Sequence, residues 1–305
     1  VNDLASDMLR MQAVREAQPG LSHPEGSHWQ TEFARAFPYS ETADQAEAID
    51  SVGADLRRSR PMDRLLCGHV GYGKTEVAMR AAFQAIDGGR QVAVLVPTTV
   101  LAEQHYRTFS ERMAEFPVTI ESLSRFKTRK QQLGTLQRVA EGSVDVVIGT
   151  HKLIQPSVRF RDLGLVVIDE EQRFGVRHKE RLKMLRQTVD VLTLTATPIP
   201  RTLQMALTGV KEMSMIATPP IDRLAVRTFV LPYDPVVVRE AIMREHFRGG
   251  QTFYVCPRIE DLDGVAQRLG EIVPEVKIGL AHGRMAKRAL EDVMNAFYDG
   301  SLDLL

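Results

Sequence analysis

The sequence has 305 residues, of which 44% are hydrophobic and 26% are charged, and its 39 Lys and Arg balance 39 Asp and Glu. This length suits more than one domain, and the balanced charge gives no overall indication of a nucleic-acid partner, so any polyanion site must come from local clusters of basic residues. No apolar run of about 18 residues or secretory pattern occurs, and Cys67 and Cys256 lie far apart in apolar contexts, so we expect a reduced, cytoplasmic, non-membrane protein with both thiols buried.

The chain begins with a helical pattern that the stretch QPGLSHPEGSH interrupts. Its prolines and glycines predict a connector over residues 1–36 rather than a domain. A second helical pattern runs from about residue 44 to 58, and Thr42 and Gln45 are spaced to form a capping box at its start.

Short segments rich in Val, Leu and Ile then alternate with helical patterns. The apolar segments are RLLCG, QVAVLVP, VTIESL, VDVVIGT, LGLVVIDEE and VDVLTLTAT, and the helical ones include KTEVAMRAAFQAI and TTVLAEQHYRTFSERMAEF. Near-continuous apolar strands with helical crossovers predict an α/β fold whose parallel sheet is covered on both faces.

The alternation restarts after a proline-marked stretch near residues 217–234. Helices are expected over 236–249, 261–273 and 285–300, with strands at QTFYVCP and VKIGLAHG and the start of another at LDLL. We therefore predict a first lobe over residues 37–221 and a second over 222–305, and we expect the second to be incomplete because it stops within a strand pattern.

The segment GHVGYGKT fits the phosphate-binding pattern GxxxxGK[ST], with a strand before it and a helix after it. Glycines let backbone N–H groups turn toward phosphates, and the helix N-terminus adds positive charge. Lys74 would then reach the β- and γ-phosphates and Thr75 would coordinate Mg²⁺. The plain alternative is a glycine turn without a ligand.

Acidic residues end the strand LVVIDEE, at the sheet edge where open α/β folds bind ligands. Asp169 would hold Mg²⁺ and Glu170 would orient and deprotonate the attacking water, as phosphoryl transfer requires. The alternative is that acidic residues merely end a strand.

The segment FPYSETADQ supplies a candidate adenine site one helix before the loop. An aromatic ring such as Phe37 can stack on adenine, and the Gln45 amide can both donate to and accept from its edge. Thr42 and Gln45 could equally serve only as a capping box, or do both.

In this order, FPYSETADQ, GHVGYGKTE, PTTVLAEQH, GTHKLI, DEEQ, TATP and HGRM resemble the tandem RecA-like motor of superfamily 2 helicases and translocases. DEEQRFGVRHKERLK and TLTATPIPRTLQMAL are more closely similar to the bacterial transcription-repair coupling factors, over about residues 36–305. The related fork-regressing RecG helicases share PIPRTL and remain the alternative.

The resemblance implies tandem RecA-like P-loop domains with parallel sheets, the second truncated at its C-terminus. It implies an ATP- and Mg²⁺-dependent translocase on double-stranded DNA that moves stalled RNA polymerase and recruits excision repair at the bacterial nucleoid. RNA polymerase and nucleotide-excision-repair proteins would bind parts of such proteins that this sequence does not include.

The resemblance also assigns site residues. The expected ATP-binding residues are Phe37, Gln45, Gly68, Gly71, Tyr72, Gly73, Lys74 and Thr75. The expected catalytic residues are Lys74, Thr75, Asp169, Glu170 and Gln172, with Thr75 and Asp169 as Mg²⁺ ligands. The expected DNA contacts, whose hydroxyls and loop N–H groups suit sugar and phosphate, are Pro97, Thr98, Thr99, Arg125, Gly149, Thr150, His151, Thr195, Thr197, Arg258, His282, Gly283 and Arg284.

Two features depart from the family pattern. His69 stands where relatives usually carry Asp, at a variable position of the loop, and the sequence ends before the motifs that supply an arginine finger. We therefore expect a chain that binds nucleotide but hydrolyses ATP slowly or not at all. A P-loop enzyme unrelated to DNA and a non-catalytic interaction module remain the rival classes.

Basic clusters and single histidines offer further candidates. For the cluster from Arg125 to Lys130 a solvated face balanced by nearby acids is favoured, whereas the cluster from Arg173 to Lys183 is expected near DNA. No Cys or His lies at metal-ligand spacing from the histidines, which argues against a zinc site.

Overall fold

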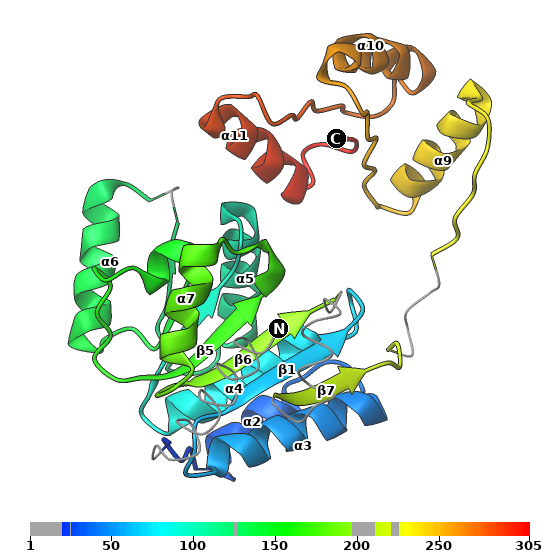
Figure 1. The fold of residues 1–305 in the computed structure, drawn as a ribbon. Coiled ribbons are helices and arrows are strands. Elements are labelled where there is room, and N and C mark those ends of the chain that lie inside the picture. The colour runs from blue at the N-terminus through cyan, green and yellow to red at the C-terminus, as the bar shows by residue number, and fades with distance from the viewer. Residues whose placement is uncertain (1–19, 25, 125–126, 197–210, 221–225) are drawn as a thin grey trace, which may run out of the picture. The chain divides into compact units, whose positions relative to one another are not determined.

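The computed structural model describes residues 20–24, 26–124, 127–196, 211–220 and 226–305 (Figure 1). The chain divides into two compact units, Val1–Leu224 and Ala225–Leu305. This boundary lies close to the predicted one near residue 222.

The first unit is built on a seven-stranded sheet in which every strand pair is parallel. Its spatial order is β3-β4-β2-β5-β6-β1-β7. The strands are β1 (Asp63–Gly68), β2 (Gln91–Leu95), β3 (Ile120–Leu123), β4 (Val146–Gly149), β5 (Leu163–Asp169), β6 (Asp190–Thr195) and β7 (Glu212–Ile216). The predicted parallel α/β fold and the six strands β1 to β6 are therefore confirmed.

Helices cover both faces of this sheet, as the uninterrupted apolar strands require (Figure 1). On β2, Val94 packs with the helices of one face and Leu95 with those of the other, because successive strand side chains alternate. The first layer consists of α2 (His28–Arg35), α3 (Ala43–Arg57), α4 (Lys74–Asp87) and α5 (Thr99–Arg112), and the second of α6 (Arg129–Glu141), the 3₁₀ turn η1 (His151–Ile154) and α7 (Val176–Leu185).

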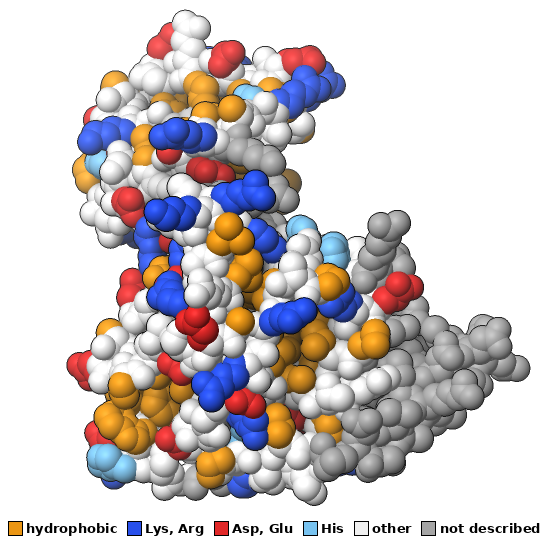
Figure 2. Space-filling view, turned by 90° about the vertical axis from the view of Figure 1, so that its left-hand side faces the viewer, with side chains coloured by type: hydrophobic (Ala, Val, Ile, Leu, Met, Phe, Trp, Pro, Cys, Tyr) orange, Lys and Arg blue, Asp and Glu red, His pale blue; other side chains and the backbone are white. Residues whose placement is uncertain are grey.

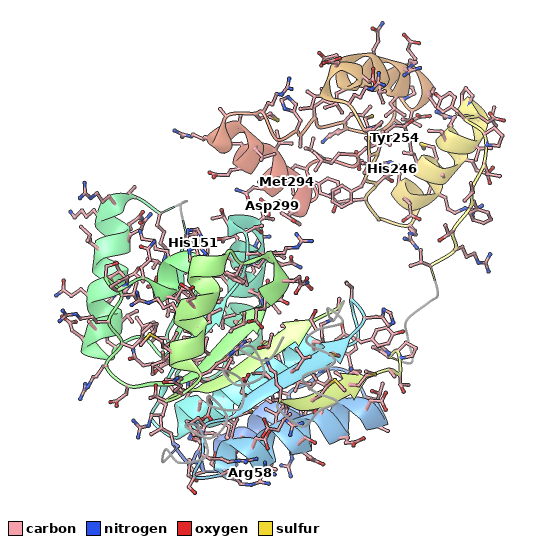
Figure 3. The ribbon with its side chains drawn as sticks, viewed as in Figure 1. Arg58, His151, His246, Tyr254, Met294 and Asp299 are labelled. Atoms are coloured by element: carbon pink, nitrogen blue, oxygen red, sulfur yellow. The ribbon has the colours of Figure 1, made fainter. Side chains whose placement is uncertain are left out.

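The second unit is small and helical in its regular elements. It contains α9 (Pro235–Phe247), the 3₁₀ turn η3 (Ile259–Asp261), α10 (Leu262–Ile272) and α11 (Lys287–Tyr298). A core around Ile242, Leu269, Val273 and Leu304 packs with Tyr254 of the intervening chain (Figure 3). His246 on α9 contacts Asp303 at 3.2 Å between Nδ1 and Oδ1.

The regular strands predicted for the second unit are wrong. The segments around Thr252 and Ile278 form only isolated parallel bridges, each with Leu304. Single backbone hydrogen bonds join them to the segment around Leu304, such as Thr252 N–H to Asp303 and Gly279 N–H to Leu304, without a regular ladder. A second RecA-like sheet is therefore not evident among the described residues.

The exposed surface carries both charge signs. On the face in Figure 2, Lys and Arg side chains lie among Asp and Glu side chains, in keeping with the zero net charge. Both cysteines are free, but only Cys67 is buried, whereas Cys256 is half-buried, so the expectation for Cys256 is wrong. None of the helices in the described ranges has the length and apolar character needed to cross a bilayer.

Candidate nucleotide-binding site

A cleft of about 1650 Å³ opens at the carboxyl edge of the first unit's sheet, where β1 and β5 end. It brings together most of the side chains that the sequence assigned to ATP and Mg²⁺. Its lining includes Phe37, Gln45, Gly71, Gly73, Lys74, Thr75, His105, Asp169 and Glu170. Residues far apart in the sequence, such as Phe37 and Glu170, thus meet at one edge of the sheet.

The loop between β1 and α4 depends on glycine at two positions. Gly71 has φ 79° and Gly73 has φ 85°, in the left-handed region that side chains disfavour. A Cβ on Gly73 would lie 2.3 Å from Nε2 of Gln45. Gly73 therefore both turns the chain into α4 and makes room for Gln45.

Lys74 lies across the mouth of this loop. Its ammonium donates to the carbonyl oxygens of Gly68 at 2.6 Å and His69 at 3.0 Å. Gly68 itself is buried, and His69 is exposed beside Tyr72 at 5.3 Å between ring centroids. His69, which stands where relatives usually carry Asp, therefore does not displace the Lys74 ammonium from the loop.

Gln45 performs two structural tasks at once. Its Oε1 accepts the backbone N–H of Thr42 at 2.9 Å within the capping box of α3. Its Nε2 donates to the carbonyl of Tyr72 at 2.9 Å. The capping interpretation is therefore confirmed, and the same amide ties α3 to the phosphate-type loop.

Replacing Gly73 by Ala should damage the cleft more than the fold. We expect about 1–2 kcal/mol of left-handed backbone strain plus displacement of Gln45, and hence weaker ATP binding. Gly89→Ala is the matched control, because Gly89 has φ 74° but nothing within 4 Å of its Cβ. Urea unfolding and ATP titration of both variants test this: equal ATP affinity in the two would contradict the role of Gly73.

The carboxylates at the end of β5 are held in different ways. Oδ2 of Asp169 lies 2.9 Å from Nε2 of His105, which is buried on α5. Glu170 is the single non-glycine residue with positive φ in the described ranges, at φ 53° and ψ 50°. Gln172 donates from its amide to the Glu170 carboxylate. Of the predicted catalytic residues, Glu170 thus adjoins Asp169 and Gln172, while Lys74, Thr75, Asp169 and Glu170 line the same cleft.

A charge cluster of two buried residues, Asp63 and Lys211, and two half-buried ones, Glu171 and Arg186, supports the turn that follows Glu170. Arg186 at the end of α7 donates from Nη2 to Glu171 at 2.8 Å, and its Nε lies 3.7 Å from Asp63. Lys211 lies 3.1 Å from Asp63 and 3.2 Å from the hydroxyl of Thr193. Burial alone would raise the pKa of Glu171, but the nearby Arg186 and Lys211 outweigh it and hold that pKa below its usual value.

The residues expected to contact DNA occupy several places. Thr98 caps α5 by accepting the N–H of Leu101 at 3.2 Å, and Thr195 is buried at the end of β6. Pro97 and Thr99 adjoin Thr98, whereas Gly149, Thr150 and His151 join β4 to η1, with His151 labelled in Figure 3. Arg258, His282, Gly283 and Arg284 belong to the second unit, and Arg125 and Thr197 lie outside the described residues.

The first basic cluster is partly paired within the fold. Lys127 lies 2.5 Å from Glu121, which also contacts Arg138. This pairing agrees with the solvated, balanced face that was favoured for that cluster. Within the described ranges no group of three or more His, Cys, Asp and Glu side chains is arranged to hold a metal ion.

Three features of the site escaped the sequence interpretation. The sequence pattern indicated no role for His105, whose contact with Asp169 spans 64 positions. Asp44 accepts the N–H groups of Ala217 and Thr218, 173 and 174 positions away. The third feature is a network of carboxylates and guanidinium groups around Glu76. Only its i,i+4 pair, Glu76 and Arg80, could have been predicted from the sequence.

A family model described as DEAD/DEAH box helicase matches residues 42–206. Over its whole length the chain is 54% identical to the transcription-repair-coupling factor of Escherichia coli and 52% identical to that of Bacillus subtilis. It spans about a quarter of these curated relatives, 27% and 26% of their lengths. The predicted resemblance to the helicase region of coupling factors is thereby confirmed.

Solved structures of DNA-bound helicases share the fold of this chain. A structure of RecG bound to a three-way DNA junction is 36% identical, with a TM-score of 0.76 over 98% of this chain and 40% of that one. A structure of the helicase MrfA bound to DNA matches with a TM-score of 0.64 over 94% of this chain and 46% of that one, and at 16% identity it supports the fold alone.

Proposed function

The chain belongs to the DEAD/DEAH box helicase family, whose members use ATP, and on this basis we propose that it is part of the motor of an ATP-dependent double-stranded DNA translocase in transcription-coupled repair. The observation that carries the proposal is the cleft, which gathers a phosphate-type loop, a candidate adenine side and two carboxylates at one sheet edge.

The residues present fit a triphosphate with a divalent cation. The loop between β1 and α4 curves through two left-handed glycines, which bring backbone N–H groups and the N-terminus of α4 to one side of the cleft. Lys74 would exchange its contacts with the Gly68 and His69 carbonyls for the β- and γ-phosphates. Thr75 and Asp169 would hold Mg²⁺, which supplies charge neutralisation at the phosphates.

Glu170 is the residue that we assign to the attacking water. Its carboxylate would orient the water and accept its proton, and Gln172 keeps the carboxylate in place. His105 contacts one oxygen of Asp169, so the other oxygen would be the one to hold the cation. Phe37 and Gln45 would contact the adenine. The Gln45 amide uses one lone pair for Thr42 and one N–H for Tyr72, and its second N–H and second lone pair would pair with the edge of the base.

We assign contacts with the DNA backbone to the loops that follow β2 and β4. In a second RecA-like lobe, Arg258 and the turn at residues 282–284 would make the equivalent contacts. Closure of that lobe on ATP, followed by hydrolysis and reopening, would move the grip along one strand. RNA polymerase and excision-repair proteins would bind regions found in the longer relatives. A RecG-like motor that regresses forks is the second candidate, favoured by the 36% identity over 98% of the chain.

ATP turnover with and without duplex DNA tests this function. We expect the present chain to bind ATP but turn it over slowly, and a version extended to the length of the curated relatives to hydrolyse ATP faster when duplex DNA is added. Turnover that DNA leaves unchanged in the extended version would contradict the proposal. Displacement of a stalled RNA polymerase by the extended version would separate the coupling function from fork regression.

A further inference from the structure

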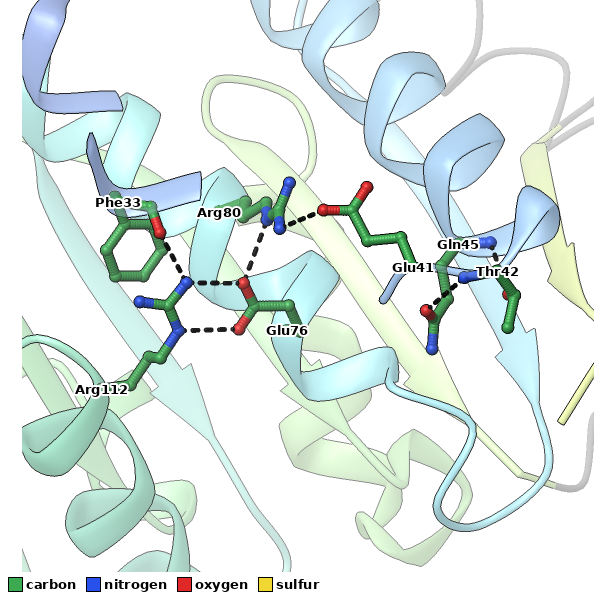
Figure 4. A network of polar contacts seen from close by, with 7 residues as sticks. All are labelled: Phe33, Glu41, Thr42, Gln45, Glu76, Arg80 and Arg112. Carbon is green, nitrogen blue, oxygen red and sulfur yellow. Dashed lines mark hydrogen bonds and ion pairs between the residues drawn. The ribbon is translucent and has the colours of Figure 1, made fainter. Parts of the chain in front are cut away.

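A buried carboxylate on α4 holds both ends of the segment that carries Phe37. We propose that Glu76 is a positioning residue that sets the preference for adenine, by fixing two guanidinium groups around this segment (Figure 4). The inference rests on the proposed function, because it takes the base of ATP to lie beside Phe37.

The first guanidinium belongs to Arg112 on α5. Its Nε and Nη2 lie 3.1 Å and 2.9 Å from the two oxygens of Glu76, a bidentate pair. The same Nη2 donates to the carbonyl of Phe33 at 2.6 Å, and the Arg112 Cζ lies 3.9 Å from the Phe33 ring centroid. Arg112 thereby anchors the last turn of α2, directly before Phe37.

The second guanidinium belongs to Arg80, one turn after Glu76 on α4. Its Nε donates to Glu76 at 3.0 Å, and its Nη2 contacts the carboxylate of Glu41. Glu41 directly precedes Thr42, whose capping box orients Gln45. Arg80 thereby anchors the other end of the segment, beside the second candidate adenine contact.

Phe37 lies between these anchors. Its ring centroid is 5.6 Å from the Cζ of Arg80 and 5.7 Å from that of Arg112, within the range of cation–π attraction. The Glu76 side chain is only 7% exposed, so water competes little for its partners. The Glu76 carboxylate therefore fixes the position of the Phe37 ring through the two arginines.

The position of Glu76 connects the two ends of the nucleotide site. It follows Thr75 directly, so the first turn of the helix that would bind phosphate also carries the anchor of the adenine side. A ring and an amide held in fixed positions discriminate between bases because a base with a different edge leaves their polar groups unmatched. Loss of Glu76 should therefore impair base recognition while sparing the phosphate contacts.

The test compares ATP, GTP and inorganic tripolyphosphate binding in equilibrium titrations with Mg²⁺. Glu76→Gln should weaken ATP binding at least tenfold, which corresponds to at least about 1.4 kcal/mol, while the binding of GTP and of tripolyphosphate changes less than about threefold. Glu121→Gln is the matched control, since Glu121 also pairs with two cations in the same unit and should leave the preference unchanged. Glu41→Gln removes only the contact of Arg80 with a more exposed carboxylate. It should also lower the ratio of ATP affinity to GTP affinity, and it provides the test if Glu76→Gln does not fold.

The outcomes separate the inference from the proposed function. If the unmodified chain binds ATP more tightly than GTP and the folded Glu76 variant keeps that ratio, Glu76 does not position the adenine side. An equal fall for all three ligands would likewise overturn the inference, because it indicates a general structural role. Absence of ATP binding by the unmodified chain would overturn the proposed function itself.

Discussion

Replacing Glu170 by Gln is expected to slow ATP cleavage about 10²–10⁴-fold while ATP still binds, because the amide cannot accept the proton of the attacking water. The left-handed backbone at Glu170 places this residue at the cleft beside Asp169, and such strain at a non-glycine residue is typical of functional sites. Single-turnover ATP cleavage, in the version extended to the length of the curated relatives, measures the effect.

A nearby carboxylate provides the control for this prediction. Glu180 on α7 is exposed and does not line the cleft, so Glu180→Gln should leave the cleavage rate within about twofold of the unmodified protein. If Glu170→Gln cleaves ATP as fast as Glu180→Gln does, the proton acceptor is another group. Loss of ATP binding in Glu170→Gln would show that Glu170 serves binding instead.

Replacing Arg186 by Met is expected to lower the free energy of unfolding by about 3–5 kcal/mol at neutral pH. The substitution retains apolar volume but leaves the buried Asp63 and the half-buried Glu171 with one cation, Lys211, near them. Urea unfolding measures the loss. Arg90→Met is the control, because Arg90 pairs with Asp162 at the surface and should cost less than about 1 kcal/mol.

The pH dependence gives this prediction a second readout. Glu171 has a lowered pKa in the folded protein, so its stabilising contribution is present above its ordinary pKa of 4.5 and is lost as the pH falls through the lowered value. Without Arg186, burial favours the protonated form, so the gap in stability between the variant and the unmodified protein should narrow below pH 4.5. A gap that stays constant with pH would show that Glu171 is not the group affected.

The sheet of the first unit was predictable because its strands are short, apolar and buried on both faces. β7 was missed, since Glu212–Ile216 is only partly buried and contains Glu and Ser, as an edge strand allows. The segments expected as strands in the second unit contain strand-favouring residues, but regular pairing depends on their neighbours in the fold, and there they form only isolated bridges with Leu304. Composition alone does not contain that information.

The phosphate-type loop and the acidic strand end were likewise predictable from local spacing. The contacts that orient them were not, because each depends on residues brought together by the fold. His105 reaches Asp169 across 64 positions, and Arg112 reaches Glu76 across 36. Gln45 illustrates the intermediate case, in which the cap could be recognised locally and the contact with Tyr72 could not.

A crystal structure of this chain with Mg²⁺ and a non-hydrolysable ATP analogue tests the central claim most directly. The account predicts a triphosphate within the loop of residues 68–75, the adenine beside Phe37 and Gln45, and the cation between Thr75 and Asp169. A nucleotide bound elsewhere, with this loop and both carboxylates free of it, would contradict the account.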